Sequence, residues 1–232
     1  MPVRTVLVDL GGTLVDLFGH TSPGQVLPLS LASAARALVL EGHDVPPQNV
    51  LERSWEGQKR VPDDLEVRPL EARLSAVFGP DAIDDRTMDA ACRAFMRPLF
   101  DQARVFEDTF PFLSALRSRG IEAVIVSNTT WGSPAILWRE AVERMAIRPW
   151  VRSVVFCRDV GWRKPDPRVF SHALSMADRG PEECLFVGDD PVWDVMGPQR
   201  VGIRAVLLDR RAERIGQGFD RVTNLREITD HI

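Results

Sequence analysis

The chain has 232 residues, of which 44% are hydrophobic and 27% charged, a composition typical of a globular protein with a full core. Its formal net charge of −4 offers no basic excess for nucleic acid or an anionic membrane, so we expect neither as a partner. No apolar run approaches the length of a membrane span and no signal-peptide pattern is visible, which predicts a cytoplasmic protein.

The first predicted element is a buried strand over residues 3–9, because its run from Val6 to Val8 is aliphatic and partly β-branched. Gly11 and Gly12 then turn the chain, which places Asp9 at the carboxyl end of the strand. Ligands bind at this edge in open α/β sheets. A carboxylate there is able to attack phosphorus or hold a cation. Taken alone, it equally suits an acidic residue that stabilises a turn.

A helical block follows over residues 18–104, with no convincing strand from about Leu27 to Gln102. Gly and Pro residues separate four segments that have helix-like apolar spacing. The four predicted helices are Leu29–Glu41, Asn49–Arg60, Pro69–Phe78 and Arg86–Asp101. We interpret the block as an inserted helical unit. The alternative, an extra layer of the same domain, is not separated from it by sequence.

Strands and helices alternate through the rest of the chain. The predicted strands are 121–127, 151–156, 184–188 and 204–208, and the predicted helices are Phe110–Arg119, Ala135–Met145, Pro167–Ala177 and Trp193–Val201, with Arg221–Ile228 closing the chain. Such repeated units require parallel pairing with right-handed crossovers. We therefore predict an α/β fold, with a doubly wound, Rossmann-like parallel sheet formed by residues 1–17 and 105–232.

Polar side chains follow three of the later elements. Ser127 ends one predicted strand, Asp189 follows another, and Asp194 lies five residues beyond it. Lys164 precedes a turn broken by proline. It is one of two lysines, with Lys59, among 27 arginines, and it offers a compact point charge where arginine would offer a planar fork.

In this order, Asp9, Ser127, Lys164 and the Asp189/Asp194 pair resemble the four motifs of the haloacid dehalogenase (HAD) superfamily. The resemblance covers nearly the whole chain and implies that the helical unit, 18–104, is a cap. It further implies a Mg²⁺-dependent phosphatase that acts on a small phosphorylated metabolite through an aspartyl-phosphate on Asp9. By the same resemblance, the Mg²⁺ ligands are Asp9, the backbone carbonyl of Gly11 and Asp189, with Asp194 acting from behind or through water.

The resemblance assigns Ser127 and Lys164 to the transferring phosphoryl group, since charge-assisted donors stabilise its oxygens. Gly12, Thr13 and Asn128 are predicted substrate-binding residues. A structural role competes for two of them, loop fixation for Thr13 and turn capping for Asn128. The oligomeric state is not predicted.

Gly11 departs from the family pattern, in which a second Asp usually stands two residues after the nucleophile. Loss of a general acid/base costs about 10²–10⁴-fold in rate. Three interpretations stay open: a phosphatase limited to activated leaving groups or using a surrogate acid such as His20, a metal-independent 2-haloacid dehalogenase, and a non-catalytic module that binds a phosphorylated ligand or a protein. The complete Asp189/Asp194 pair counts against the dehalogenase, and Asp190 is as well explained by helix capping.

Aromatic residues and cysteines give weaker predictions. Three tryptophans near the motifs either line a substrate pocket or fill gaps between helices and sheet; they are Trp131, Trp162 and Trp193. Trp138 and Trp150 are predicted to be structural, Trp55 suits either role, and the arginines of the helical unit are expected to form a solvated face. The scattered cysteines lack a CxxC pair and are predicted to be reduced core residues rather than zinc ligands; they are Cys92, Cys157 and Cys184.

Overall fold

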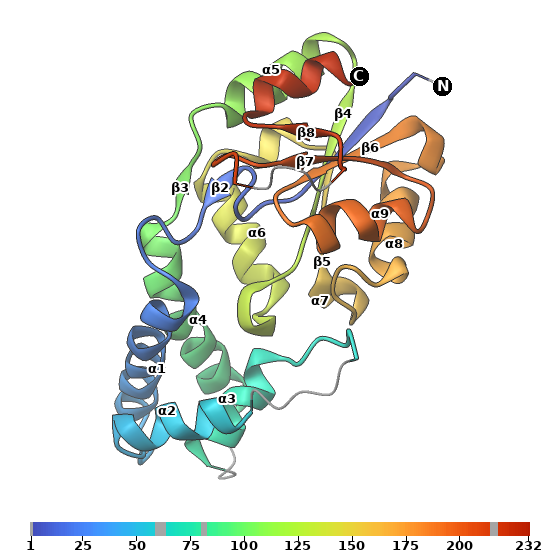
Figure 1. Cartoon of the computed structure of the whole chain (residues 1–232). Helices are drawn as coiled ribbons and strands as arrows, with labels where there is room; N and C mark the ends of the chain where they lie inside the picture. The colour runs from blue at the N-terminus through green and yellow to red at the C-terminus, as the bar shows by residue number, and fades with distance from the viewer. Residues whose placement is uncertain (1, 59–63, 80–82, 214–217) are drawn as a thin grey trace.

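A six-stranded parallel sheet forms the core of the computed structural model, which describes residues 2–58, 64–79, 83–213 and 218–232 (Figure 1). Neighbouring strands follow the order β5-β4-β1-β6-β7-β8. The strands are β1 (Thr5–Val8), β4 (Glu122–Ser127), β5 (Ser153–Phe156), β6 (Cys184–Gly188), β7 (Arg204–Leu208) and β8 (Arg221–Val222). The predicted parallel sheet is confirmed.

Strand β1 lies at the centre of the sheet, with β4 on one side and β6 on the other. Thr5 is in register with both Glu122 and Cys184. After β1 the chain adds β4 and β5 on one side, then crosses to β6, β7 and β8 on the other. Such a reversal of strand order opens a crevice at the carboxyl ends of the strands, and the residue that follows β1 there is Asp9.

Both faces of the sheet are covered, because side chains alternate along a strand. Val6 and Val8 pack into the same apolar cluster as α5 (Thr109–Ser118) and α6 (Ala135–Arg144). Leu7 packs on the opposite face, against α8 (Pro167–Ala177). The short helices α7 (Cys157–Val160) and α9 (Gly197–Gln199) complete the core.

Four helices stand together at one end of the molecule, away from the sheet (Figure 1). They are α1 (Pro23–Leu40), α2 (Gln48–Gly57), α3 (Leu70–Phe78) and α4 (Asp85–Gln102). We call them the cap helices. Their buried side chains continue without a break into the apolar cluster on one sheet face. The division of the chain at residues 18–104 therefore stays a proposal.

A short antiparallel pair joins the cap helices to the core. β2 (Val15–Asp16) pairs with β3 (Arg104–Val105), where the chain enters and leaves the helical unit. Two residues per strand are too few to show a period of two in the sequence, so the pair was not predicted.

Several predicted boundaries need correction. Helix α1 begins at Pro23, six residues before the predicted start, and keeps Pro28 inside it. The predicted helix Trp193–Val201 is instead a π-helical segment, η4 (Pro191–Met196), followed by α9. The closing segment forms β8 and a 3₁₀ helix, η5 (Leu225–Asp230).

Other sequence predictions are tested directly. Cys92, Cys157 and Cys184 are free and buried, as predicted. Among the described helices, none combines the length and the apolar character that crossing a membrane requires. Lys59, the second lysine, lies outside the described residues.

Candidate active site

Lys164 connects two of the predicted site carboxylates. Its Nζ donates hydrogen bonds to Asp9 Oδ1 at 2.7 Å and to Asp194 Oδ1 at 2.6 Å. The lysine is 1% exposed, Asp194 1% and Asp9 6%, so these ion pairs are shielded from water. Residues 155 positions apart therefore meet at the crevice beside β1.

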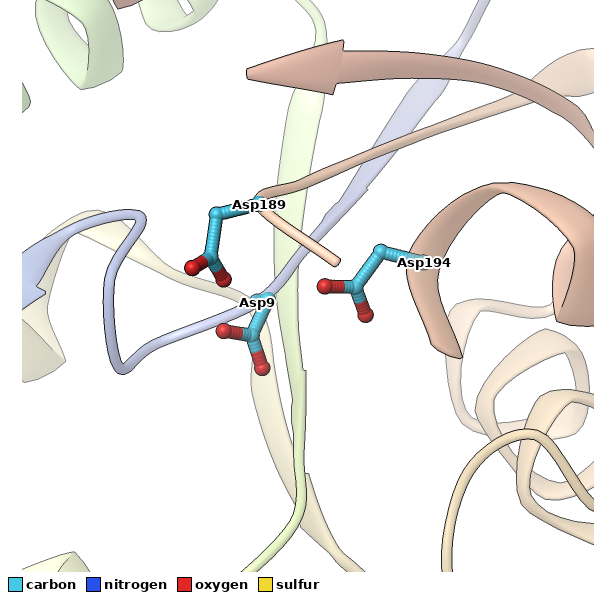
Figure 2. Close-up of side chains that lie close together, drawn as sticks. All are labelled: Asp9, Asp189 and Asp194. Carbon is cyan, nitrogen blue, oxygen red and sulfur yellow. The ribbon is translucent and has the colours of Figure 1, made fainter. Parts of the chain in front are cut away.

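Three carboxylates point toward one another at this edge, from the end of β1, the loop after β6 and η4 (Figure 2). Asp9, Asp189 and Asp194 each offer an oxygen that lies within 4.8 Å of the others. Among the described residues, Asp189 forms no ion pair with a cationic side chain. One ammonium group thus faces three carboxylates, which leaves an excess of negative charge.

The electrostatics of the site reflect this excess. Burial raises the pKa of the Asp189 carboxyl to about 7, and the nearby charge of Asp9 acts in the same direction. Burial also raises the pKa of Asp194 to about 7, although the charge of Lys164 opposes the rise. Burial lowers the pKa of the Lys164 ammonium, but the Asp194 and Asp9 carboxylates outweigh it and hold the pKa above its usual value.

Two glycines make room for these carboxylates. A Cβ on Gly12 would lie 2.4 Å from Asp189 Oδ2, and Gly12 has a φ of +82°. A Cβ on Gly188 would lie 2.4 Å from Asp194 Cγ. Both approaches are closer than any Cβ tolerates, so the absence of a side chain lets the backbone come against each acid.

Asn128 positions the lysine loop. Its Oδ1 accepts the backbone N–H of Lys164 at 2.8 Å, and its Nδ2 donates to the Lys164 carbonyl at 3.3 Å. Both polar atoms of the Asn128 amide thus bond to the backbone of Lys164. Substrate binding by Asn128 stays a prediction, while its contribution to lysine placement is visible.

The remaining predicted residues divide by their surroundings. Ser127 ends β4 next to β1 and is 4% exposed, and its Oγ lies 3.4 Å from the Asn128 carbonyl. Thr13 is fully buried, which favours a structural role. Asp190 caps η4, where its Oδ1 accepts the N–H groups of Val192 and Trp193 at 2.8 and 2.9 Å. Capping was the competing interpretation for Asp190.

The position of Gly11 is closed by a hydrophobic side chain. A Cβ there would lie 2.5 Å from Leu17 Cδ1, and Leu17 is 8% exposed. The Cβ of any side chain at position 11 would therefore meet Leu17, which would have to shift. His20, the candidate surrogate acid, is exposed in the turn after β2.

A cavity of about 1000 Å³ lies between the cap helices and this edge of the sheet. Trp131 and Trp193 line this cavity, in line with the interpretation that tryptophans near the motifs line a pocket. Trp162 is not among the lining residues. Trp55 is buried inside the cap, and Trp138 is buried in the core with its Nε1 bonded to Ser133 Oγ at 2.8 Å.

Sequence reasoning missed a segment that lines the cavity. Residues 64–69 form a strap that pairs with the loop before Lys164: Arg163 N donates to Leu65 O at 2.8 Å, and Val67 N donates to Gly161 O at 2.9 Å. Two arginines of the helical unit, Arg68 and Arg73, depart from the expected solvated face because they line the cavity, as does Arg163 of the core. No periodicity marks the strap, since its partner lies almost 100 residues away.

Comparisons with known proteins agree with this geometry. A family model described as haloacid dehalogenase-like hydrolase matches residues 3–202. The chain is 37% identical over 134 residues to a phosphoserine phosphatase of Thermus thermophilus, a match that covers 56% of the chain and 50% of that relative. It is 27% identical over 210 residues to phosphoglycolate phosphatase 1 of Pseudomonas aeruginosa, a match that covers 88% of this chain and 69% of that relative.

A solved structure shares the fold. The 2-haloacid dehalogenase from Pseudomonas syringae pv. Tomato DC3000 superposes with a TM-score of 0.70 over 98% of this chain and 97% of that one, at 19% identity. This likeness concerns the fold alone. The chain spans half the length of the phosphoserine phosphatase, so the activity of that whole protein does not transfer by the match itself.

Proposed function

Because the chain belongs to the haloacid dehalogenase-like hydrolase family, we propose that it is a Mg²⁺-dependent phosphatase that uses Asp9 as the nucleophile. The observation that carries the proposal is the buried contact of Lys164 with both Asp9 and Asp194, beside Asp189, at the reversal point of the sheet. A nucleophile, a phosphoryl-binding cation and spare carboxylates occur together there.

Asp9 attacks the phosphorus, and the bond to the leaving oxygen breaks as the aspartyl-phosphate forms. Lys164 donates to Asp9 Oδ1 at 2.7 Å, and in this proposal Asp9 Oδ2 is the oxygen that attacks. Lys164 and Ser127 stabilise the charge on the transferred phosphoryl oxygens. Water then cleaves the intermediate, which releases phosphate and restores Asp9.

The acidic residues suit a hard divalent cation, since Mg²⁺ prefers carboxylate and carbonyl oxygens and keeps several waters. Asp9, Asp189 and the Gly11 carbonyl would hold the ion, with Asp194 contacting it through water. The excess of negative charge at the site is the feature that such a cation balances. When bound, Mg²⁺ neutralises charge that develops on the phosphoryl oxygens.

Sequence relatives favour phosphate esters over haloacids. Both relatives described above carry phosphatase names, and one of them is matched over 88% of the chain. We therefore propose a small phosphorylated metabolite as the substrate.

Metal removal tests this proposal. We expect phosphate release from a panel of phosphate monoesters in Mg²⁺, a fall to background in EDTA, and recovery when Mg²⁺ is restored in excess. Phosphate release at an unchanged rate in EDTA would contradict the proposed Mg²⁺ dependence. Halide release from a 2-haloacid in EDTA, with no phosphate release in Mg²⁺, would replace the phosphatase with a dehalogenase.

We also propose that Gly11 restricts the enzyme to activated leaving groups. Without an acid at this position the leaving oxygen departs unprotonated, which an aryl or acyl phosphate tolerates and an alkyl phosphate does not. Leu17 supports this proposal, because its Cδ1 lies 2.5 Å from the position of the Cβ that an acid at residue 11 would carry.

The double variant Gly11→Asp, Leu17→Ala is expected to raise kcat for alkyl phosphates by roughly tenfold or more, because it supplies the acid and the space for it. Gly11→Asp alone is expected to gain less, since Leu17 must move. Leu17→Ala alone is the matched control and should gain nothing. Equal wild-type rates on alkyl and aryl phosphates would contradict the restriction.

A further inference from the structure

The cavity between the cap helices and the sheet adjoins the loops that carry the candidate active site. Three of its lining residues are immediate sequence neighbours of site residues: Asn128 follows Ser127, Arg163 precedes Lys164, and Trp193 precedes Asp194. A phosphate ester held at Asp9 would have this cavity beside it as the space for its leaving group. The residues that line the cavity would then contact the leaving group and select it.

The lining carries more positive than negative charge, although the chain as a whole is acidic. Three arginines and one acid, Glu66, contribute to it. Arg68 is paired, with Asp64 at 2.7 Å and Glu66 at 3.1 Å. Among the described residues, neither Arg73 nor Arg163 forms an ion pair with a carboxylate.

Arg73 is held in a defined orientation. Its guanidinium carbon lies 3.9 Å from the centre of the Trp55 ring, and Trp55 is 1% exposed. Gln58 accepts from its Nε at 3.4 Å and donates to its carbonyl at 3.1 Å. These contacts orient the guanidinium, and no hydrogen bond from its terminal N–H groups is found among the described residues. A fork of this kind matches the two oxygens of a carboxylate or a phosphate.

The transferring phosphoryl group does not explain these arginines. Lys164 makes the contacts to Asp9 and Asp194, from the core side of the site. Arg73 comes from α3 in the cap, and Arg163 has its backbone tied to the strap at Leu65. Burial lowers the pKa of Arg73, a cost that an anion bound beside it offsets.

Resting on the proposed phosphatase function, we infer that the substrate is a phosphomonoester with a second acidic group, a carboxylate or another phosphate, which Arg73 binds with help from Arg163. The apolar walls at Trp131 and Trp193 then contact the part of the molecule between the two acidic groups. Arg73 is a specificity residue in this arrangement, not a catalytic one.

Matched aryl phosphates test the inference. We expect kcat/KM for 4-carboxyphenyl phosphate to exceed that for 4-carbamoylphenyl phosphate by about 10- to 100-fold, as for a charge-assisted hydrogen bond. The two differ by one charge at nearly constant shape. 1,4-Phenylene bisphosphate forms a third arm, and whichever acid is preferred identifies the second group.

Variants assign the preference to the arginine. Arg73→Gln is expected to bring the ratio of acid to amide to within about twofold, mainly through KM, and Arg73→Lys to leave an intermediate ratio because it keeps the charge but not the fork. Arg163→Gln should lower the ratio partly. Arg53→Gln, an equal charge change on the exposed surface of α2, should preserve it.

Binding separates failure of this inference from failure of the phosphatase proposal. The Kd values of 4-carboxybenzylphosphonate and its carboxamide, measured by calorimetry, need no turnover. Tighter binding of the acid that Arg73→Gln removes would support the subsite even if no ester is hydrolysed. Equal binding of acid and amide, or a preference that Arg73→Gln leaves intact in a folded protein, would overturn it.

Discussion

Lys164→Met is expected to destabilise the fold by about 3–5 kcal/mol, because it leaves buried carboxylates without their cation. The ammonium is 1% exposed and contacts both Asp9 and Asp194 within 2.7 Å. Removing it leaves three acids in one cluster without a cationic partner among the described residues. Urea unfolding without added divalent cations measures the loss as a change in the free energy of unfolding.

Two controls show whether the loss comes from unbalanced charge. Arg97→Met breaks an ion pair with Asp101 in which both side chains are more than half exposed, and should change stability by less than about 1 kcal/mol. Adding Asp194→Asn to Lys164→Met removes one of the stranded acids and should recover part of the stability. A Lys164→Met protein as stable as the wild type would contradict a structural role for the lysine.

Most of the sheet could be predicted from sequence because each central strand is an aliphatic run that stops at a polar residue. Strand β6 and helix α8 have the predicted bounds. The approach of Lys164 to Asp9 was expected from the family resemblance instead, because this lysine lies in the loop before α8 and not at a strand end. The features that could be predicted are therefore local ones: a strand and the turn that follows it.

Features that depend on distant partners could not be predicted. Leu17 fills the space beside Gly11 only because of how the chain turns after β1, and a leucine at that position looks like any core residue. Arg73 was expected in solvent, since its helix spacing reveals neither the Trp55 ring against its guanidinium nor the strap that lines the cavity. The residues proposed to set specificity therefore lie in the part of the structure that sequence patterns describe least.

The position of Gly11 connects the two proposals. An enzyme without a proton donor at the leaving oxygen depends on the leaving group itself for reactivity, while a charged cavity selects that group by its second acid. Both conditions are met by an activated ester whose leaving group carries an anion. The matched aryl phosphates satisfy both, which is why they are suitable probes for this site.

Asp9→Asn is expected to lower kcat for phosphate release by about 10⁴-fold or more, because the amide cannot form the phosphoryl-enzyme bond. The fold should survive, since the substitution keeps the shape, leaves an oxygen to accept from Lys164, and removes one negative charge from an acidic cluster. Asp16→Asn is the matched control: Asp16 accepts the N–H groups of Phe18 and Gly19, which asparagine also does, and its kcat should stay near the wild-type value.

Covalent trapping identifies the nucleophile directly. Fluoroberyllate, which mimics a phosphoryl group on aspartate, should raise the Tm of the wild type in Mg²⁺ and leave that of Asp9→Asn unchanged. Acid quenching during turnover, followed by peptide mass analysis, should find the phosphoryl group on Asp9. The assignment of Asp9 as the nucleophile would be wrong if Asp9→Asn kept a tenth of the wild-type turnover, or if the phosphoryl group were found on Asp189. The ion pair between Asp9 and Lys164 would then have a structural role only.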